Sequence, residues 1–470
     1  MPERAAVMAE GGPSGPPGHV STGVSAFAWG YNARAALGLG HTARVLSPAP
    51  THLPSETIDV QGGLNFTVAL TRAGEVYAWG GNQYGQLGDG TTSLRWKPTR
   101  VTLPKGVRVA AIAVGADHVL ATTTVGGLFA WGRNHRGQVG NGSTTDVHTP
   151  VDVRKGITGP VTAVAAGNGI SAAVTKSGDL FLWGRNTFGQ LGPSQTDRAL
   201  SNTLPTMAAL PKGADVIAVA AGNRHVVVAL RDGRLIIFGL DAAGRPSEGT
   251  IGLQPSWGRP AKLAAGEDFT LVLTTRNVLL ALGANASGQL GVGDYVNRLQ
   301  PTVVKLPQAT GQVRDVLAGA RGGAALTSSG EVLVWGDGNS GQLGAGDGTK
   351  ALAPRHTPAA VTALAGARVI GLHGGHHHAF VSVTSGPAVA LRVTPTSTTV
   401  AAGVQVTYQV RKVDTFGNDL GPAAQVKITI SDGVVVGTKV SARTPGVHHV
   451  TARSGRLVGT AILTVSKGPR

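Results

Sequence analysis

The stretch WGGNQYGQLG, residues 79–88, follows the apolar run VYA at 76–78 and turns on its glycines. The same pattern returns in six more copies, which start at Trp29, Trp131, Trp183, Phe238, Leu282 and Trp335. Successive copies begin 50, 52, 52, 55, 44 and 53 residues apart. A fixed period near 50 residues is typical of a solenoid or a β-propeller. The chain is therefore a repeat protein, and the strands around the turn must decide between these two architectures.

The residues before each turn predict a pair of buried strands. Each repeat opens with a small-residue run that ends in glycine, continues into an apolar strand, and reaches a second strand that ends in WG or its equivalent. In HVVVALRDGRLIIFG, residues 225–239, Asp232-Gly233 between two apolar runs is a strong hairpin signal. Strands that are apolar on both faces suit burial between neighbouring sheets, as in the blades of a propeller.

The two ends of the repeat array complement each other. The chain begins the array with only the second half of a repeat, residues 24–38, and leaves it with only a first half, residues 369–383. Joined, these halves complete a seventh blade and pair the N-terminal strand with the C-terminal one. A solenoid would need polar caps instead, and closure removes exposed sheet edges. We therefore expect an all-β fold, a seven-bladed β-propeller closed by N- and C-terminal half-blades.

The sequence changes character after the array. From Ala388 onward the turn is absent, and alternating strands are expected at Gln405–Val410 and Gln425–Ile430. About 80 residues of this kind predict a small β-sandwich. The N-terminal residues are rich in Pro and Gly and offer little to bury, which predicts a disordered tail. The expected organisation is a tail at 1–21, a propeller at 22–386 and a sandwich at 387–470.

The composition limits the class of protein. Gly 70 is about twice the usual share and charged residues reach only 14%, which fits many tight turns in a β-rich fold. The absence of cysteine excludes disulfides, thiol catalysis and cysteine metal sites. The formal charge of +16 is spread along the chain, with no basic run of five or more. Diffuse positive charge favours acidic partners, including nucleic acid and anionic cell surfaces, but a solvated basic surface is the simpler interpretation.

The chain carries no signal for a membrane. The first 20 residues lack the apolar segment of a signal peptide, and no window of 18 apolar residues occurs. A membrane-spanning protein is therefore not expected. The missing signal peptide favours the cytoplasm, whereas the C-terminal sandwich favours a secreted or cell-surface protein, so the localisation stays open.

The WG-x-N-x-x-GQLG turn and the AAG-x-x-H strand opening resemble the regulator of chromosome condensation repeat family over about 360 residues. The C-terminal segments VTPTSTTVAAG, DTFGND and GTAILTV are similar to bacterial immunoglobulin-like domains. The first resemblance implies guanine-nucleotide exchange on a small GTPase with chromatin binding, as in eukaryotic members, or inhibition of β-lactamases through the loops, as in a secreted bacterial member. The sequence has no long insertion resembling the exchange wedge, and a bacterial-type sandwich is at odds with nuclear work.

The repeated letters of the turn are expected to serve the fold. Gly80, Gly85 and Gly88 permit positive φ and close backbone approach, while Asn82 and Gln86 can satisfy loop backbone groups. The tryptophans are expected in the blade core rather than as sugar platforms, and they are Trp79, Trp131, Trp183 and Trp335. The GDGNSG at 336–341 matches a dinucleotide fingerprint, but no helix is expected after it.

Metal and catalytic candidates are few. The segment HGGHHH at 373–378 has no carboxylate or cysteine nearby to complete a ligand set, and its last histidine falls on a position that is also His118 and His225. Asp414 and Asp419 are expected to stabilise a turn. No GxSxG, HExxH or GxxxxGK[ST] motif is present, so no catalytic residue, metal or cofactor is predicted. A Ser/His/Asp set could still assemble across blades.

The positions that the repeat leaves free carry the functional prediction. Two loops per blade hold them, the pair after AAG and the pair after WG-x-N, and strand order should place both loops on one face. The first set is Leu64, Asn65, Asp117, Asn168, Asn223, Arg224, Glu267, Asp268, Arg321, His376 and His377. The second set is Arg34, Gln83, Tyr84, His135, Arg136, Thr187, Phe188, Ser287, Asn339 and Ser340. Tyr, Phe, Arg and His anchor many protein interfaces, and the resemblance implies that inhibitor-like relatives contact their partners at these positions.

We therefore predict a non-enzymatic, monomeric binding module. Its loops would meet a protein partner or a cell-surface polymer, with the sandwich as spacer or attachment, and the function could be inhibitor-like. One alternative is a guanine-nucleotide exchange factor or a chromatin- or DNA-associated regulator. Another is a hydrolase or lyase in the propeller funnel, which needs a carboxylate or histidine pair within reach of one substrate atom.

Overall fold

The computed structural model describes residues 24–192, 201–240, 246–308, 311–346 and 352–467. The chain divides into two compact units: an N-terminal unit of residues up to 363 together with 369–382, and a C-terminal unit of 364–368 and 383–470. Regular structure in the described ranges is nearly all β-strand, with short 3-10 helices at Pro255–Trp257 and Thr362–Leu364. Within these ranges no helix has the length and apolar character needed to cross a membrane. The tail predicted at 1–21 lies outside them.

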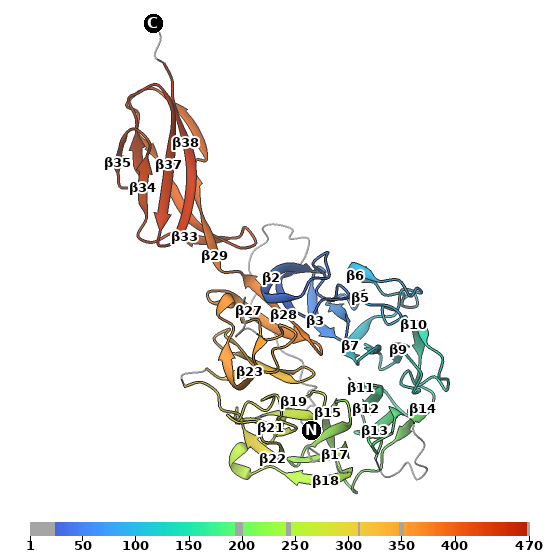
Figure 1. The fold of residues 1–470 in the computed structure, drawn as a ribbon. Coiled ribbons are helices and arrows are strands. Elements are labelled where there is room, and N and C mark those ends of the chain that lie inside the picture. Colours follow the sequence, from blue (N-terminus) through green and yellow to red (C-terminus); the bar gives the residue numbers. More distant parts are fainter. Residues whose placement is uncertain (1–23, 193–200, 241–245, 309–310, 347–351, 468–470) are drawn as a thin grey trace, which may run out of the picture. The chain divides into compact units, whose positions relative to one another are not determined.

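The strands of the N-terminal unit form sheets arranged around a common centre (Figure 1). Five sheets have four strands each. A sixth sheet has eight strands in the order β2-β1-β28-β27-β3-β4-β5-β6, and its two four-stranded halves meet through the single parallel pair Gly374 and Gln61. Each four-stranded group uses one strand from each of four concentric positions, which is the arrangement of a β-propeller.

The strand bounds follow the repeat. The innermost strands are β3 (Thr57–Gly62), β7 (Val109–Val114), β11 (Val161–Ala166), β15 (Val216–Ala221), β19 (Pro260–Ala265), β23 (Val313–Ala318) and β27 (Arg368–Gly374). The second strands are β4 (Phe66–Thr71), β8 (His118–Thr123), β12 (Ile170–Thr175), β16 (His225–Leu230), β20 (Phe269–Thr274), β24 (Gly322–Thr327) and β28 (His378–Ser385). The third strands are β5 (Val76–Gly80), β9 (Leu128–Gly132), β13 (Leu180–Arg185), β17 (Arg234–Leu240), β21 (Leu279–Gly283), β25 (Val332–Gly336) and β1 (Val24–Gly30). The outer strands are β6 (Arg95–Arg100), β10 (Val147–Asp152), β14 (Ser201–Met207), β18 (Pro246–Gly252), β22 (Arg298–Val303), β26 (Arg355–Ala360) and β2 (Val45–Leu53).

The second strand of each group is the most deeply buried. Every residue of β4, β8, β12, β16 and β20 is buried, on both faces of the sheet. The apolar sequence on both faces explains this burial, because each sheet packs between two neighbours. The turn at Asp232-Gly233 also forms as predicted, since β16 ends at Leu230 and β17 begins at Arg234.

The predicted pairing of the chain ends is confirmed. Strand β1 runs antiparallel to β28, from the pair Ala26 and Ser382 to the pair Gly30 and His378. The Trp29 indole donates a hydrogen bond to Gln342 O at 2.8 Å, which links β1 to the preceding turn. The first described strand is therefore held inside a sheet whose inner strands come from the far end of the array.

The repeated tryptophans connect neighbouring sheets. Each of the five is 1% exposed or less, and each indole Nε1 donates to a backbone carbonyl in the turn of the preceding group. The donor and acceptor pairs are Trp29 and Gln342, Trp79 and Ala36, Trp131 and Gln86, Trp183 and Gln138, and Trp335 and Gln289. The core role predicted for Trp79, Trp131, Trp183 and Trp335 is confirmed, and Trp29 shares it.

Three sheet interfaces also carry a buried histidine. His118 Nε2 lies 2.8 Å from Ser171 Oγ, and Ser171 Oγ donates in turn to Gln138 O at 2.7 Å. The serine oxygen therefore accepts from the protonated Nε2. His225 with Thr270 (2.9 Å) and His378 with Thr67 (3.0 Å) repeat the contact. In the other four repeats the second strand does not begin with histidine. The residue at the facing position of the next sheet is then Val119, Val226, Gly323 or Ala379, none of which has a hydroxyl. A hydroxyl therefore occurs at this position only opposite a histidine.

The C-terminal unit contains ten short strands in three sheets. The sheet orders are β29-β32-β33, β30-β38-β37-β34 and β31-β36-β35. The strands are β29 (Ala388–Thr394), β30 (Ser397–Val400), β31 (Val406–Thr407), β32 (Gln409–Asp414), β33 (Asp419–Pro422), β34 (Lys427–Ile430), β35 (Val434–Val436), β36 (Lys439–Ser441), β37 (Gly446–Ser454) and β38 (Leu457–Val465). One apolar cluster, which includes Leu391, Tyr408, Val440 and Leu463, forms its core.

Two strand predictions in this unit need correction. The strand expected at Gln405–Val410 is interrupted at Tyr408, whose ring is 1% exposed and whose N–H donates to Thr438 O instead of a neighbouring strand. The strand expected from Gln425 begins only at Lys427, because Gln425 has a φ of +50° that a strand cannot accommodate. The turn role predicted for Asp414 is confirmed, since its carboxylate accepts the N–H groups of Phe416, Asn418 and Gly386.

Candidate functional site

In the described ranges, two loops of a repeat lie side by side and form a surface that we call the loop face. The inner loop joins the first and second strands, and the outer loop follows the third strand. In each repeat the N–H after the WG pair, or its equivalent, donates to the carbonyl just before the second strand, as Gly81 does to Asn65 at 2.8 Å. The other donors and acceptors are Arg133 and Asp117, Arg185 and Gly169, Leu240 and Arg224, Ala284 and Asp268, Asp337 and Arg321, and Tyr31 and His377.

A second set of backbone hydrogen bonds links the inner loops to one another. Leu64 N donates to Ala116 O at 2.9 Å, and the series ends where His376 N donates to Gly63 O at 3.4 Å. The bonds between them run from Ala116 to Gly167, Asn168 to Gly222, Asn223 to Glu267, Glu267 to Ala320, and Ala320 to His376. These seven bonds form a closed circuit. The inner-loop backbone is therefore held without help from the side chains that it carries.

The repeated letters of the turn hold the outer loop in the same way. Asn82 Oδ1 accepts the N–H of Leu87 at 2.9 Å, and Gln86 Oε1 accepts the N–H of Tyr84 at 2.9 Å. Gly80 has a φ of +103°, and a methyl group there would lie 2.6 Å from the Asn65 carbonyl oxygen. The scaffold role predicted for these residues is confirmed. The Gln83 and Tyr84 side chains take no part in this bonding.

The structure places the predicted partner residues as follows. The exposed ones are Arg34, Gln83, His135, Thr187, Arg321 and Asn339. The partly buried ones are Leu64, Asn65, Tyr84, Arg136, Asn168, Phe188, Asn223, Arg224, Glu267, Asp268, Ser287, Ser340, His376 and His377. Asp117 is buried, with 8% of its surface exposed. All belong to the inner or outer loops, and the backbone circuit brings the inner-loop members into one ring.

Two arginines that the sequence prediction omitted lie among these residues. Arg133 covers the Tyr84 ring at 4.4 Å, and Arg185 covers the Phe188 ring at 4.8 Å. Both occupy the single free position inside WG-x-N, where Arg133 follows β9 and Arg185 is the last residue of β13. The prediction took only the pair after the asparagine. The residue type at that position varies from one repeat to the next, and this variation was the sequence signal that could have identified the two arginines.

Ion pairs join the inner loops of neighbouring groups to each other and to the outer loops. Arg133 lies 3.3 Å from Asp117, Arg224 lies 2.6 Å from Asp268, and Arg321 lies 3.1 Å from Glu267. Burial raises the pKa of Asp117 while the nearby Arg133 opposes the shift. The hydrogen bond that Arg224 donates to Asp268 raises the pKa of Arg224. The loop face is thus a surface of paired charges with aromatic rings among them.

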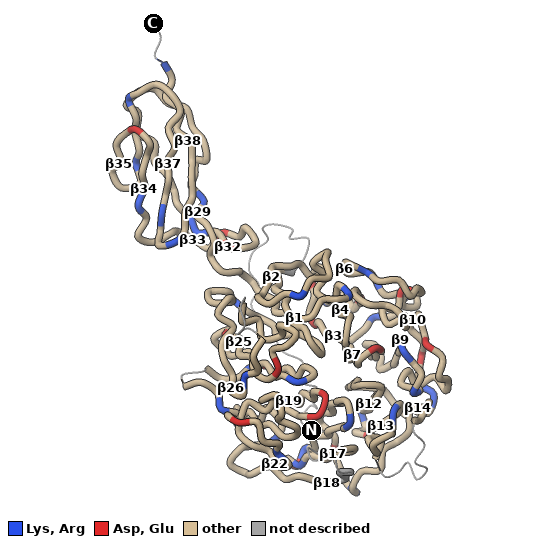
Figure 2. Tube along the Cα trace, viewed as in Figure 1, with Lys and Arg blue, Asp and Glu red and all other residues tan. Residues whose placement is uncertain are grey.

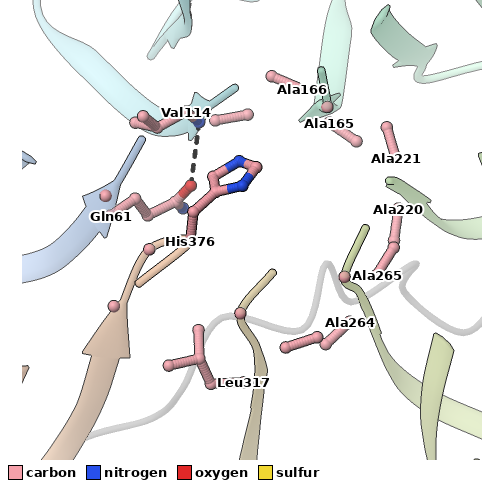
Figure 3. Close-up of a pocket in the computed structure, with 18 of the residues that line it drawn as sticks. Gln61, Val114, Ala165, Ala166, Ala220, Ala221, Ala264, Ala265, Leu317 and His376 are labelled. Carbon is pink, nitrogen blue, oxygen red and sulfur yellow. Dashed lines mark hydrogen bonds between the residues drawn. The ribbon is translucent and has the colours of Figure 1, made fainter. Parts of the chain in front are cut away.

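The innermost strands enclose a cavity of about 360 Å³ along the centre of the propeller. Its walls are mainly alanine, valine and leucine side chains, and Figure 3 shows Gln61 and His376 directed into it. Gln61 Oε1 accepts the N–H of Val114 at 3.2 Å. Burial lowers the pKa of His376 to about 4, so its imidazole is neutral near pH 7. Across the described ranges, no group of three or more His, Cys, Asp or Glu side chains is placed to hold a metal ion.

One Ser-His-Asp arrangement does assemble at this cavity. His373 Nε2 lies 3.3 Å from Ser382 Oγ, and His373 Nδ1 lies 3.8 Å from Asp59 Oδ1. The second distance exceeds that of a hydrogen bond. Ser382 is 8% exposed, belongs to the second strand β28, and lies outside the cavity lining, which includes His373 and Asp59. A serine in that position cannot reach a substrate in the cavity, so the arrangement does not form a nucleophilic site.

The GDGNSG segment at 336–341 takes the same conformation as the other turns. Gly336 ends β25, and Ser340 N donates to Gln342 Oε1 as Tyr84 does to Gln86. No helix follows it in the described residues up to 346. A dinucleotide site of the strand-turn-helix kind is therefore absent from this part of the chain.

The chain has relatives in plants and animals. It is similar to the ultraviolet-B receptor UVR8 of Arabidopsis thaliana, at 33% identity over 356 residues, which is 72% of this chain and 77% of that protein. It is also similar to the E3 ubiquitin-protein ligase HERC2 of Homo sapiens, at 31% identity over 387 residues. That match covers 77% of this chain but only 8% of HERC2.

Solved structures show the same fold. Human WBSCR16 superposes with a TM-score of 0.66 at 23% identity, over 77% of this chain and 98% of that one. Prp20p of Saccharomyces cerevisiae superposes with a TM-score of 0.65 at 20% identity, over 77% of this chain and 92% of that one. At these identities the likeness concerns the fold alone. Both structures are consistent with the propeller arrangement of the sheets described above.

The sequence profile of the regulator of chromosome condensation (RCC1) repeat matches six segments of the chain, residues 25–70, 73–122, 125–174, 177–229, 277–326 and 329–382. The gap in this series, 230–276, contains the weak turn copy at Phe238, which has neither the tryptophan nor the GQLG ending. The matched segments make up more than half of the chain, and each runs from the third strand of one four-stranded group to the second strand of the next. The chain belongs to the regulator of chromosome condensation (RCC1) repeat family.

Proposed function

We propose that this protein is a non-enzymatic protein-binding module whose loop face contacts a protein partner. The observation that carries the proposal is that different residues of the repeat hold the loops in place and form their exposed surface. Backbone hydrogen bonds and the Asn and Gln side chains of the turn fix the loops, while the side chains at the free positions differ from one repeat to the next. A rigid surface with variable side chains loses little conformational entropy on binding, which favours recognition.

The contact residues that we propose are those of the two loop sets together with Arg133 and Arg185. The cation–π pairs with Tyr84 and Phe188 hold two aromatic rings in place at the loop face. Aromatic and arginine side chains contribute most of the binding energy in many interfaces. The ring pairs therefore supply candidate anchors, and the exposed polar residues around them would form the rim.

We also propose that the propeller has seven blades. Counting each half of the eight-stranded sheet as one blade adds two blades to the five separate sheets. The closed circuit of seven inner-loop hydrogen bonds supports this count. The propeller would occupy residues 22–386, and the sandwich, which we assign to the immunoglobulin-like type, would occupy 387–470 as a spacer or a cell-surface attachment.

The relatives support a protein partner over a small-molecule substrate. The Prp20p structure was described together with its binding to Gsp1p and histones, and Kap60 was solved bound to Prp20. Those partners belong to Prp20, but they indicate that propellers of this fold serve as protein-binding surfaces. The resemblance of the turn implies two forms of protein binding, nucleotide exchange and an inhibitor-like role, and the first is measured below.

An affinity-capture experiment tests the proposal. The bait is the intact protein, compared with a loop-face variant, Tyr84→Ala/Arg136→Ala/Phe188→Ala, in an extract of the native organism. The matched control changes three exposed residues of the opposite loops, Arg72→Ala/Lys105→Ala/Val125→Ala. We expect the control to retain the partners of the intact protein and the loop-face variant to lose them. Equal capture by all three baits would contradict the proposal.

Two further measurements separate the alternatives. Release of labelled GDP from small GTPases of the same organism would reveal exchange activity, and retention on duplex DNA at moderate salt would reveal chromatin-type binding. The loop-face proposal predicts neither. Acceleration of nucleotide release by the intact protein, lost in the loop-face variant, would assign the same surface to exchange instead.

A further inference from the structure

Charge on the loop face is unevenly distributed around the ring. Four arginines lie on three consecutive blades, at Arg133, Arg136, Arg185 and Arg224, while the next blade presents Glu267 and Asp268. Figure 2 shows basic and acidic positions scattered over the sheets, with no continuous basic band. The question is which of the arginines already have a carboxylate partner.

Two of the four arginines are paired and two are not. Arg133 is bound to Asp117 and Arg224 to Asp268. Among the residues that the structure describes, neither Arg136 nor Arg185 has a carboxylate within ion-pair distance. Arg185 instead donates from Nη1 to the neutral amide oxygen Asn223 Oδ1 at 3.2 Å.

The two unpaired arginines flank a glycine. A methyl group added at Gly169 would lie 3.6 Å from Arg185 Cβ and 3.9 Å from Arg136 Cγ. All the other repeats have a residue with a side chain at the equivalent inner-loop position, for example Asn65 and Asp117. Gly169, which is itself buried, therefore places no side chain between the stems of the two arginines, and we call this missing side chain the gap at Gly169.

Polar groups border the same gap. Asn168 Nδ2 donates to Asn223 Oδ1 at 3.0 Å, which fixes both amides beside Arg185. Burial lowers the pKa of Arg185, and the positive charges of Arg136 and Arg224 lower it further. Burial lowers the pKa of His135 nearby, and the positive charges of Arg133, Arg136 and Arg185 lower it further. The local potential is thus positive, and an anion at the gap would relieve it.

We propose that the gap at Gly169, between Arg136 and Arg185, receives a carboxylate from an acidic segment of the protein partner. The proposal rests on the function assigned to the loop face above. A guanidinium fork matches a carboxylate in two parallel hydrogen bonds. The Phe188 ring beneath Arg185 then supports the apolar part of the same segment.

The surroundings favour an acidic protein segment over nucleic acid. Asp117, Asp146 and Asp268 lie around the arginines, and two of them form the ion pairs described above. A phosphate backbone carries a charge at every step and would meet these carboxylates, whereas a protein segment can place a single carboxylate at the gap. Nucleic-acid binding usually needs a continuous basic track.

The glycine offers a test with a matched control. Gly169 has a φ of +76°, and no atom lies closer than 3.6 Å to an added methyl group. Asn and Asp are the side chains that best tolerate this conformation. Gly169→Asp places a permanent carboxylate between the arginines, while Gly169→Asn adds nearly the same volume without charge. A second pair of variants tests the charges themselves. Arg136→Ala/Arg185→Ala removes two positive charges from the loop face, and Arg72→Ala/Lys105→Ala removes two from the opposite loops.

The experiment is a fluorescence-anisotropy titration of the full-length protein with a labelled hexaglutamate peptide, in parallel with hexaglutamine and a single-stranded hexanucleotide. We expect hexaglutamate to bind and hexaglutamine not to bind. Gly169→Asp and Arg136→Ala/Arg185→Ala should each weaken hexaglutamate binding by about tenfold or more. Gly169→Asn and Arg72→Ala/Lys105→Ala should change it by less than about twofold.

Three results would overturn the proposal. They are no binding of hexaglutamate, equal weakening by the opposite-face double variant, and tighter binding of the hexanucleotide with the same dependence on Gly169. The first two would leave the loop-face function intact if the affinity capture still depends on Tyr84, Arg136 and Phe188. Failure of that capture experiment would instead remove the function on which this inference rests.

Discussion

Acid should destabilise the propeller through three buried histidines, and phenylalanine at the same positions should remove that part of the acid sensitivity. His118, His225 and His378 are each 5% exposed or less and face a hydroxyl of the next sheet. Burial lowers the pKa of His118 and of His378 to about 3 and that of His225 to about 4. The folded protein therefore holds these rings neutral, while an unfolded chain protonates them near pH 6.5.

The size of the effect follows from these pKa values. Because each folded-state pKa lies below the unfolded value, the free energy of unfolding is highest above about pH 7.5, falls as the pH drops through 6.5, and levels off only below the folded pKa values. At pH 5.5, protonation of one histidine in the unfolded chain lowers the free energy of unfolding by about 1.4 kcal/mol, so three lower it by about 4 kcal/mol. Domain stabilities are about 5–15 kcal/mol, which makes this a large loss.

Phenylalanine is the matched replacement because the chain already uses it. Phe66 and Phe269 occupy the equivalent position in two other repeats, where Gly63 and Gly266 face the ring as Gly115 faces His118. The assay is urea unfolding at pH 7.5, 6.5 and 5.5 followed by tryptophan fluorescence. The seven tryptophans all lie at or before residue 335, so the signal reports the propeller and not the C-terminal unit.

Between pH 7.5 and 5.5, the variant His118→Phe/His225→Phe/His378→Phe should lose about 4 kcal/mol less stability than the native sequence. Other titrating groups are common to both proteins and cancel in the difference. The same pH dependence in the two proteins would refute the reasoning, because it would mean that the histidines are as accessible to protons in the folded state as in the unfolded one.

Three more predictions concern the scaffold. Gly80→Ala should lower the free energy of unfolding by about 2 kcal/mol or more, because its methyl group would lie 2.6 Å from Asn65 O. Gly90→Ala, whose methyl group would have its nearest neighbour at 3.6 Å, should lower it less, and urea titration of the two variants measures the difference. Trp131→Phe should cost about 1–3 kcal/mol, since the Gln86 carbonyl loses its donor at 3.0 Å; an unchanged midpoint would exclude that role. Removing residues 1–53 deletes β1 and β2 and exposes the edge of β28, so size-exclusion chromatography should show aggregation instead of a monomer.

Much of the fold could be predicted because the residues that shape the turn recur along the chain. The positive φ of Gly80, the capping roles of Asn82 and Gln86, and the pairing of the chain ends all follow from letters that return in each copy. The C-terminal unit has no such repetition. There the break at Tyr408 depends on a tertiary hydrogen bond to Thr438, which local alternation cannot reveal.

The candidate site was predictable in place but not in composition. Strand order indicates which loops share a face, but not that Arg133 reaches back over Tyr84 or that Arg185 covers Phe188. The first contact joins residues 49 positions apart in successive repeats, and the second joins residues three positions apart within one turn. The histidine interfaces carried a sequence signal that pattern reading missed. Ser171 and Thr270 each come one repeat after the histidine that they face, and Thr67 faces His378 where the two ends of the array meet.

The most direct test of the loop-face account is site-specific photo-crosslinking in the native host. A benzophenone side chain at position 188 replaces Phe188 on the loop face, and one at position 125 replaces Val125, which is 87% exposed on an opposite loop. The account predicts a crosslinked partner protein from position 188 that is absent from position 125 and that disappears when Gly169→Asp is added. Crosslinks of equal yield from both positions, or from position 125 alone, would contradict it.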